Sequence, residues 1–242
     1  MLALAKFNGL AAIASLLYPP VCTICAASVA HGEYLCDECD AKTIRIVPPF
    51  CAKCSEPFAG AITNEFNCAN CEHRSLHFDA AVAAYRSRGI VRRVILDFKY
   101  GRQLHLRHLV ARWLFAALDD DRLRCRRFDI VVPVPLHPAR ERERGFNQAA
   151  LLADLLSAQR SIQNKPVLER IRYTTTQTAF DRAERMKNLH GAFHLRKNVD
   201  VRELRVLLID DVLTTGSTLS ECARVLKKAG ASSVHAATAA RA

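Results

Sequence analysis

Several features that would assign a function directly are missing from this sequence. It has no glycine-rich P-loop and no dinucleotide fingerprint, so a bound phosphate must be held by another kind of loop. Acidic residues are in deficit, 24 against 35 Lys and Arg, and the formal net charge of +11 favours polyanions, nucleic acid first among them. An anionic membrane surface, a phosphate-rich metabolite or simply a solvated charged face would also account for that charge.

A run long enough to cross a bilayer is also missing. The apolar stretch at residues 1–20 is interrupted by Lys6 and Asn8, and it falls short of the roughly 20 apolar residues that a span needs. No basic region precedes it, as a secretory signal would require. Its apolar residues recur at helical spacing up to Pro19 and Pro20, which predicts an amphipathic helix rather than a signal or anchor. We therefore expect no stable membrane insertion and a cytoplasmic protein whose thiols stay reduced.

Cysteine is abundant instead, and it is concentrated near one end of the chain. Eight of the ten cysteines form Cys-x-x-Cys pairs, namely Cys22 with Cys25, Cys36 with Cys39, Cys51 with Cys54 and Cys68 with Cys71. Two intervening residues let both thiolates of a tight turn face one tetrahedral ion, so each pair offers half a zinc site. The remaining two, Cys125 and Cys222, are predicted to be buried and structural.

The pairs can be combined in two ways. Sequential pairing gives two compact zinc ribbons, and an interleaved arrangement of first with third and second with fourth stays open. Disulfides or redox-active dithiols are the alternatives to metal, but a reduced compartment disfavours the first. With four thiolates each, the ribbons would be structural, because no coordination position is left for catalysis.

The composition changes after Cys71, and we expect a first domain at residues 1–75 and a second at 76–242. Short β-rich runs alternate with helical ones in the second, which predicts an α/β fold around a largely parallel sheet. Strands are expected at 78–86, 128–136, 205–210 and 233–240, and helices at 89–101, 106–118, 145–159 and 217–230. Val91, Val94, Ile95 and Phe98 share one face of the first of these helices.

The stretch "RVLLIDDVLTTGSTL" carries the strongest functional signal. Asp210 and Asp211 end a buried strand, at the edge where ligands of parallel sheets bind. Two adjacent carboxylates repel each other, and a vicinal diol offsets that cost by donating hydrogen bonds to both. Thr214, Thr215, Gly216, Ser217 and Thr218 then place hydroxyls and backbone N–H groups at a helix N-terminus, which suits an anion. Together they predict a ribose 5-phosphate pocket.

A purely structural interpretation explains part of this run. Asp211 could cap a turn, and Ser217 or Thr218 could be an ordinary N-cap. Because successive strand side chains point to opposite faces, one carboxylate could also face away from the other.

The same stretch resembles the phosphoribosyl pyrophosphate (PRPP) signature of type I phosphoribosyltransferases. The whole chain resembles the ComF family of competence-associated proteins, through the four Cys-x-x-Cys pairs, "FKYG", "PVPLHPARERERGFNQ", "TQTAFDRAERMKNLHGAF" and the PRPP run in that order. The resemblance implies a phosphoribosyltransferase-like parallel-sheet domain preceded by a small zinc-ribbon domain. It also implies that Asp210 and Asp211 hold the ribose hydroxyls, that 214–218 holds the 5-phosphate, and that Mg²⁺ accompanies the pyrophosphate.

Further phosphate ligands are expected from the basic segments. Arg140 and Arg144 lie where related enzymes place their pyrophosphate loop, although the alternating glutamates would also suit an exposed, self-paired face. Lys99, before a glycine turn, could neutralise pyrophosphate. Arg182 and Arg185 fall where relatives carry a mobile hood, and a plain surface helix is the alternative there. No general base stands out, and His137 and His190 are only candidates.

Three functions fit these residues. A DNA-handling protein that binds PRPP and single-stranded DNA is expected first, since the resemblance implies a role in the uptake or use of external DNA and the +11 charge fits a phosphate backbone. A metabolic phosphoribosyltransferase acting on an unknown nitrogen nucleophile is second. In a third, the ribbons dock a partner such as a helicase.

Overall fold

The computed structural model describes residues 19–60, 66–173 and 189–242. It divides the chain into two compact units, Met1–Thr43 and Ile44–Ala242. The first cysteine set lies in the smaller unit and the second in the larger one, while the domain boundary at residue 75 stays a prediction. The helix predicted before Pro19 lies outside the described residues.

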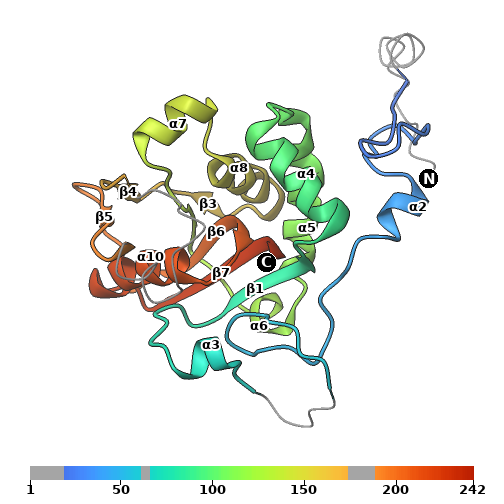
Figure 1. The fold of residues 1–242 in the computed structure, drawn as a ribbon. Helices are drawn as coiled ribbons and strands as arrows, with labels where there is room; N and C mark the ends of the chain where they lie inside the picture. Colours follow the sequence, from blue (N-terminus) through green and yellow to red (C-terminus); the bar gives the residue numbers. More distant parts are fainter. Residues whose placement is uncertain (1–18, 61–65, 174–188) are drawn as a thin grey trace, which may run out of the picture. The chain divides into compact units, whose positions relative to one another are not determined.

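The larger unit is built on a five-stranded parallel sheet, as the alternating pattern predicted (Figure 1). Its strands, in spatial order, are β1 (Ala81–Arg86), β7 (Ser233–Arg241), β6 (Arg205–Leu213), β2 (Ile130–Pro133) and β3 (Gln163–Asn164). A separate antiparallel pair joins β4 (Leu168–Arg170) to β5 (Phe193–Leu195). The fold is the α/β class that the sequence predicted.

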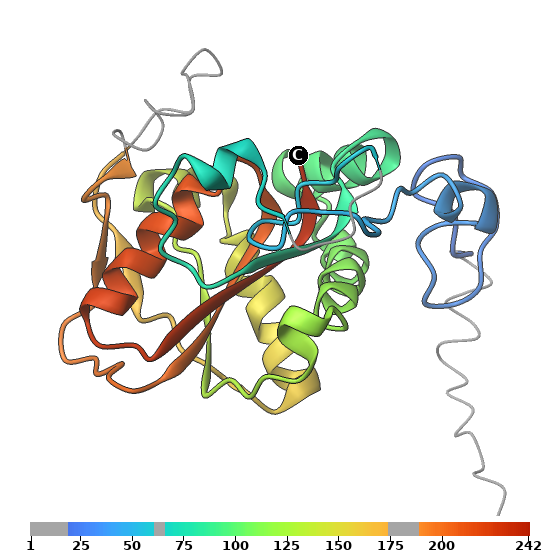
Figure 2. The same cartoon turned by 90° about the horizontal axis from the view of Figure 1, so that it is seen from below.

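Helices cover both faces of the sheet, as Figure 2 shows from below. The helices of the larger unit are α3 (Ala69–Glu72), α4 (Gly89–Tyr100), the 3₁₀ turn η1 (Leu104–Leu106), α5 (Arg107–Ala117), α6 (Asp121–Arg124), α7 (Pro138–Arg144), α8 (Gln148–Arg160) and α10 (Ser217–Lys228). Helices α5 and α8 pack on one face, and α10 packs on the other. The central strands are therefore buried on both sides, which explains the continuous apolar run at 206–209.

The helix at α4 matches its prediction closely. Val91, Val94, Ile95 and Phe98 are all buried, while the polar residues between them are exposed or half-buried. This face packs the helix onto the body and places Lys99 in its last turn. The prediction for Cys125 was wrong, because this side chain is exposed beyond the end of α6, whereas Cys222 is buried on α10 as expected.

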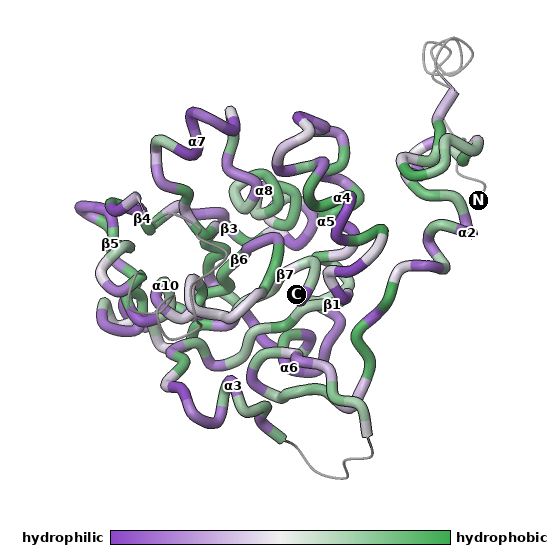
Figure 3. Tube along the Cα trace, in the orientation of Figure 1, coloured by the Kyte–Doolittle hydropathy of each residue, from purple (hydrophilic) through white to green (hydrophobic). Residues whose placement is uncertain are grey.

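Hydropathy separates the packed helices from α7. Most residues of α8 are hydrophobic, whereas those of α7 are mostly hydrophilic (Figure 3). None of the residues of α7 is buried. In the parts of the chain that the structure describes, no helix combines the length and the apolar character needed to cross a membrane.

Candidate functional site

The eight paired cysteines form two groups, and the pairing is sequential. Cys22, Cys25, Cys36 and Cys39 make the first group, and Cys51, Cys54, Cys68 and Cys71 the second, with the Sγ atoms of each group within 4.8 Å of one another. The Sγ atoms of Cys25 and Cys36 are 3.6 Å apart, as are those of Cys54 and Cys68. Tetrahedral zinc with four thiolates requires S···S separations of about 3.8 Å. Both groups thus fit a structural zinc ion.

The second group is built into the larger unit. Cys51 and Cys54 are buried in its hydrophobic core, with Cys68 and Cys71 packed against that core. Arg122 holds the first knuckle of this group, which is the turn from Cys51 to Cys54. Its guanidinium donates to the carbonyl oxygens of Cys51 at 3.2 Å and Ala52 at 3.0 Å. These contacts hold the second ribbon on the sheet domain.

The two adjacent acids lie near the carboxyl end of β6. The strand continues past them to Leu213, so it is longer than the predicted range. Asp211 points toward α4, where Lys99 Nζ lies 2.8 Å from Asp211 Oδ2. Asp210 Oδ1 instead accepts a hydrogen bond of 2.9 Å from the backbone N–H of Asp211. Each carboxylate thus has its own contact, and the two are near enough for the charge of Asp211 to act on Asp210.

Burial and neighbouring charges shift the pKa values of Asp210 and Lys99. Burial and the negative charge of Asp211 raise the pKa of Asp210 to about 7, against the opposing effect of Lys99. Burial acts to lower the pKa of Lys99, but the charges of Asp211 and Asp210 outweigh it and the pKa is raised. Near neutral pH the site thus holds an ammonium beside one carboxylate, with a second carboxyl that can take up a proton.

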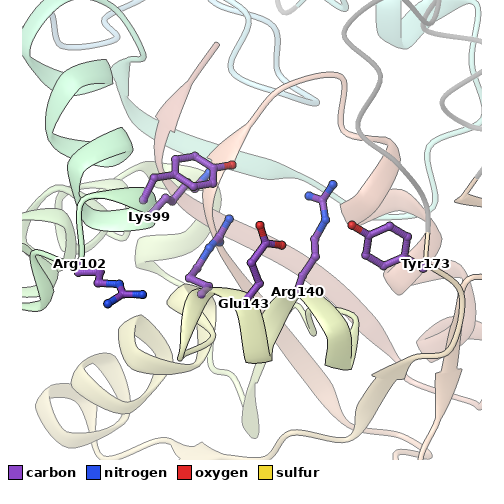
Figure 4. A pocket seen from close by; sticks show the side chains of 7 residues that line it. Lys99, Arg102, Arg140, Glu143 and Tyr173 are labelled. Carbon is purple, nitrogen blue, oxygen red and sulfur yellow. The ribbon is translucent and has the colours of Figure 1, made fainter.

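A cationic cavity opens beside Lys99. It has a volume of about 370 Å³ and is lined by Lys99, Tyr100, Arg102, Arg140, Glu143, Arg144 and Tyr173. Figure 4 shows Arg140 and Glu143 rising from α7, with Lys99 on α4 and Tyr173 at the far side. Four of the seven side chains are cations, a composition suited to a multiply charged anion.

The segment expected to form a pyrophosphate loop is largely helical. His137 caps α7 by accepting the backbone N–H of Ala139 at 3.2 Å, and Gly145 ends it at φ 85°. Arg140 and Arg144 are one turn apart and face the same cavity. Their guanidinium groups lie over aromatic rings, Arg140 5.7 Å from the centroid of Tyr173 and Arg144 4.9 Å from that of Tyr100. Arg142 is exposed, as expected.

The hydroxyl-rich loop follows the acids and leads into α10. The N-cap of α10 is Gly216 at φ 76°, without a side-chain cap, so neither Ser217 nor Thr218 is the N-cap. The hydroxyl oxygens of Thr215 and Ser217 lie 2.9 Å apart. Arg74 contacts this loop from the second cysteine group, donating to Ser217 Oγ at 2.9 Å.

Some site residues were missed from the sequence. Arg102 and Tyr173 lie in no motif, and Tyr100 lies in "FKYG" but was given no role of its own. Arg74 follows Cys71, the last of the paired cysteines, by three residues, and its role becomes visible only from where the ribbon lies. Arg182 and Arg185 lie outside the described residues, so their predicted roles stay predictions.

Family models match both parts of the chain. A double zinc ribbon domain matches residues 13–73, and a phosphoribosyl transferase domain matches residues 144–242. Among solved structures, a purine phosphoribosyltransferase from Pyrococcus horikoshii is 22% identical with a TM-score of 0.35, covering 52% of this chain and 69% of that one. The PRPP amidotransferase of Bacillus subtilis is 21% identical with a TM-score of 0.35, covering 54% of this chain and 25% of that one. Likenesses this weak support no functional argument.

Sequence relatives cover far more of the chain. Competence protein F of Haemophilus influenzae is 33% identical over 81% of this chain and 85% of its own length. The DNA utilization protein YhgH of Escherichia coli K12 is 30% identical over 90% of this chain and 96% of its own length. Competence protein ComFC of Bacillus subtilis is 37% identical over 45% and 43%. On this similarity, and with a zinc ribbon domain ahead of a phosphoribosyltransferase-like domain, the chain belongs to the ComF family.

Proposed function

We propose that this protein binds PRPP and single-stranded DNA and that it serves the uptake or use of external DNA. The observation that carries the PRPP assignment is the ion pair of 2.8 Å between Lys99 and Asp211. Through it, the acid pair of the predicted sugar site borders a cavity lined by Arg140 and Arg144. Sugar hydroxyls and pyrophosphate would therefore be held side by side.

Each part of PRPP has a matching group. The ribose hydroxyls donate to Asp210 and Asp211, the 5-phosphate accepts from the loop at 214–218, and the pyrophosphate lies among Lys99, Arg140 and Arg144. Mg²⁺ typically binds one or two carboxylates together with substrate phosphates, which the acid pair and PRPP would supply. Because hydroxyl donors and a cation both favour the ionised carboxylate, binding would release a proton from Asp210 below pH about 7.

Single-stranded DNA presents the same chemical groups. Its phosphates suit the cationic cavity, and Tyr100 and Tyr173, with 67% and 51% of their surface exposed at its rim, could stack with bases. Relatives named as competence and DNA utilization proteins support this choice over a purely metabolic transferase. We place the protein in the cytoplasm, where reduced cysteines can hold zinc.

Removal of the acid pair tests the PRPP site. Asp210→Asn combined with Asp211→Asn should weaken PRPP binding about 100-fold or more, because two charge-assisted acceptors are lost. A control with the same charge change is Asp119→Asn with Asp121→Asn, whose side chains are 76% and 84% exposed. Calorimetry with Mg²⁺ present is the measurement, with zinc content and thermal unfolding checked in parallel. Equal PRPP affinity in both double variants would overturn the assignment.

Competition tests the DNA assignment. PRPP with Mg²⁺ is titrated into the protein first, and a labelled single strand is then added while free pyrophosphate is measured. DNA handling predicts mutual exclusion without pyrophosphate release, and DNA affinity that falls at least about tenfold between low and moderate salt. Pyrophosphate release with an added base or amine favours the transferase. Salt-independent DNA binding, or none, contradicts the DNA assignment.

A further inference from the structure

Arg74 connects the second cysteine group to the loop at 214–218. Its guanidinium donates to three groups: Asn70 Oδ1 at 2.6 Å, the carbonyl oxygen of Thr215 at 3.2 Å and Ser217 Oγ at 2.9 Å. Asn70 lies between Cys68 and Cys71, so the first contact is with the knuckle itself. The other two are with the loop that we propose for the 5-phosphate.

The direction of these hydrogen bonds prepares the loop for an anion. A guanidinium only donates, so Ser217 Oγ accepts from Arg74. The hydroxyls of Ser217 and Thr215 lie 2.9 Å apart and share one hydrogen bond, in either direction. Two hydroxyls carry two protons, and their mutual bond uses one of them. Whichever hydroxyl donates within the pair, the other has a proton left to donate to an acceptor outside it.

Arg74 also adds charge where an anion would bind. Helix α10 has twelve residues and begins at Ser217, so its N-terminal end carries partial positive charge. A cation at that end is electrostatically unfavourable unless an anion accompanies it. Three hydrogen bonds fix Arg74 at this end of the helix, and its position there therefore favours an anionic ligand.

The surrounding segment holds Arg74 in place. The backbone N–H of His77 donates to Ser220 Oγ at 3.1 Å, and Phe78 is fully buried. A Cβ placed on Gly216 would meet the ring of Phe78 at 3.5 Å. The chain from Asn70 to Phe78 thus lies along the loop and the start of α10, as Figure 2 shows for α3 and its flanks.

We propose that Arg74 is a positioning residue for the 5-phosphate, and that the second cysteine group, by holding Asn70, keeps Arg74 on the loop. The inference rests on the proposed PRPP site and extends it to a residue outside the PRPP signature. The four thiolates of this group fit zinc, and the ion would fix the knuckle from which Arg74 extends. The first cysteine group has no described part in this contact.

Two ligands that each correspond to one part of PRPP distinguish a local effect of Arg74 on the loop from a general effect on the whole site. Ribose 5-phosphate tests the loop, and inorganic pyrophosphate tests the cavity around Lys99. Arg74→Gln should weaken ribose 5-phosphate binding about tenfold or more while pyrophosphate affinity stays within about twofold. Arg74→Lys should recover part of the loss, since it keeps the charge but not the planar fork. Arg93→Gln, on an exposed side chain of α4, is the charge-matched control and should change neither affinity.

Asn70→Ala tests the link to the cysteine group without touching a cysteine. It should weaken ribose 5-phosphate binding by a smaller factor, about twofold to fivefold, with zinc content unchanged. Thermal unfolding of each variant shows whether the fold is intact.

The possible failures are distinguishable. If the wild-type protein binds no ribose 5-phosphate, the proposed PRPP site itself fails. If the wild type binds it and Arg74→Gln binds equally well, or loses both ligands to the same extent, the role of Arg74 is refuted while the PRPP site stands.

Discussion

The two cysteine groups have nearly the same local geometry but very different surroundings. Cys22 donates its backbone N–H to Ala27 at 2.7 Å, and Cys51 makes the equivalent bond to Glu56 at 2.8 Å. The residue after each first pair has a positive φ, 59° at Ala26 and 58° at Ser55. Yet Cys25 of the first group is exposed, whereas Cys54, its counterpart, is buried in the sheet domain's core.

The difference shows that two metal sites with the same ligands can contribute differently to the rest of the protein. The knuckle is specified locally, by two cysteines and a tight turn, and so it recurs. Its role depends on what the flanking residues contact. In the second group these contacts reach the core, Arg122 and the loop before α10. The backbone hydrogen bonds described for the first group, such as that from Cys22 to Ala27, join residues of the smaller unit.

Removal of cysteines should give the largest contrast. Cys51→Ser with Cys54→Ser should destabilise the sheet domain by more than about 4 kcal/mol, since it removes a metal site from the core. That corresponds to a melting temperature lower by roughly 8–16 °C. The counterpart Cys22→Ser with Cys25→Ser should lose one zinc and leave the unfolding transition of the sheet domain at its wild-type temperature. Metal analysis with calorimetric melting is the measurement, and equal shifts in the two variants would abolish the distinction.

The anchoring of the Cys51–Cys54 turn by Arg122 gives the next effect. Arg122→Ala removes one donor each from the carbonyl oxygens of Cys51 and Ala52 and from the hydroxyl of Ser55. We expect a loss of about 2 kcal/mol in unfolding free energy, measured by urea denaturation. Arg124→Ala on the same helix, with a side chain 62% exposed, should stay within about 0.5 kcal/mol. A similar loss in both would show that the knuckle is held some other way.

The pH dependence of the unfolding free energy should come from the sheet domain. Asp210 has its pKa raised to about 7 in the folded protein, against about 3.9 in an unfolded chain. The folded state then holds a proton that the unfolded state has released, so stability present at low pH is lost as pH rises from about 4 through about 7. Asp210→Asn should flatten this decline and be the more stable protein at pH 8, by at least about 1 kcal/mol.

Urea denaturation at intervals from pH 5 to pH 8 measures this effect. The variant Cys22→Ser with Cys25→Ser should keep the wild-type slope, because its cysteines lie outside the sheet domain. Parallel curves for the wild type and Asp210→Asn would contradict the raised pKa.

Two glycines with left-handed backbones provide the smallest effect. Gly32, in the first unit, has φ +89°, and Gly216, before α10, has φ +76°. Replacement by Ala should cost each about 1 kcal/mol, because the conformation disfavours a Cβ. Only Gly216→Ala should also weaken ribose 5-phosphate binding in a calorimetric titration. Equal affinity in both variants would mean that the loop's backbone takes no part in binding.

Much of the fold was predictable because its signals are local. The buried face of α4 follows from four apolar residues at helical spacing. The cysteine spacing predicted zinc sites but left sequential and interleaved pairing open, and the structure shows the sequential one. The extension of β6 past Asp210 and Asp211 was not predictable, because strand pairing with β7 overrides the poor strand preference of two acids. The exposure of Cys125 depends on how α6 ends, which composition does not indicate.

The candidate site was predictable only where residues adjoin in sequence. The acids and the hydroxyl loop form one continuous run, so their proximity needed no fold. Lys99 and Asp211 are distant in sequence and meet because the fold brings the last turn of α4 to the carboxyl end of β6. Arg74 and Tyr173 join the site through the placement of the second ribbon and of the chain after β4, which a single sequence does not reveal.

A crystal structure of the protein with PRPP and Mg²⁺ tests the central claim most directly. We predict the 5-phosphate at residues 214–218 beside Arg74, the ribose hydroxyls on Asp210 and Asp211, and the pyrophosphate near Lys99. A PRPP molecule bound elsewhere, with Lys99 still paired to Asp211 and the loop occupied by neighbouring side chains, would contradict it.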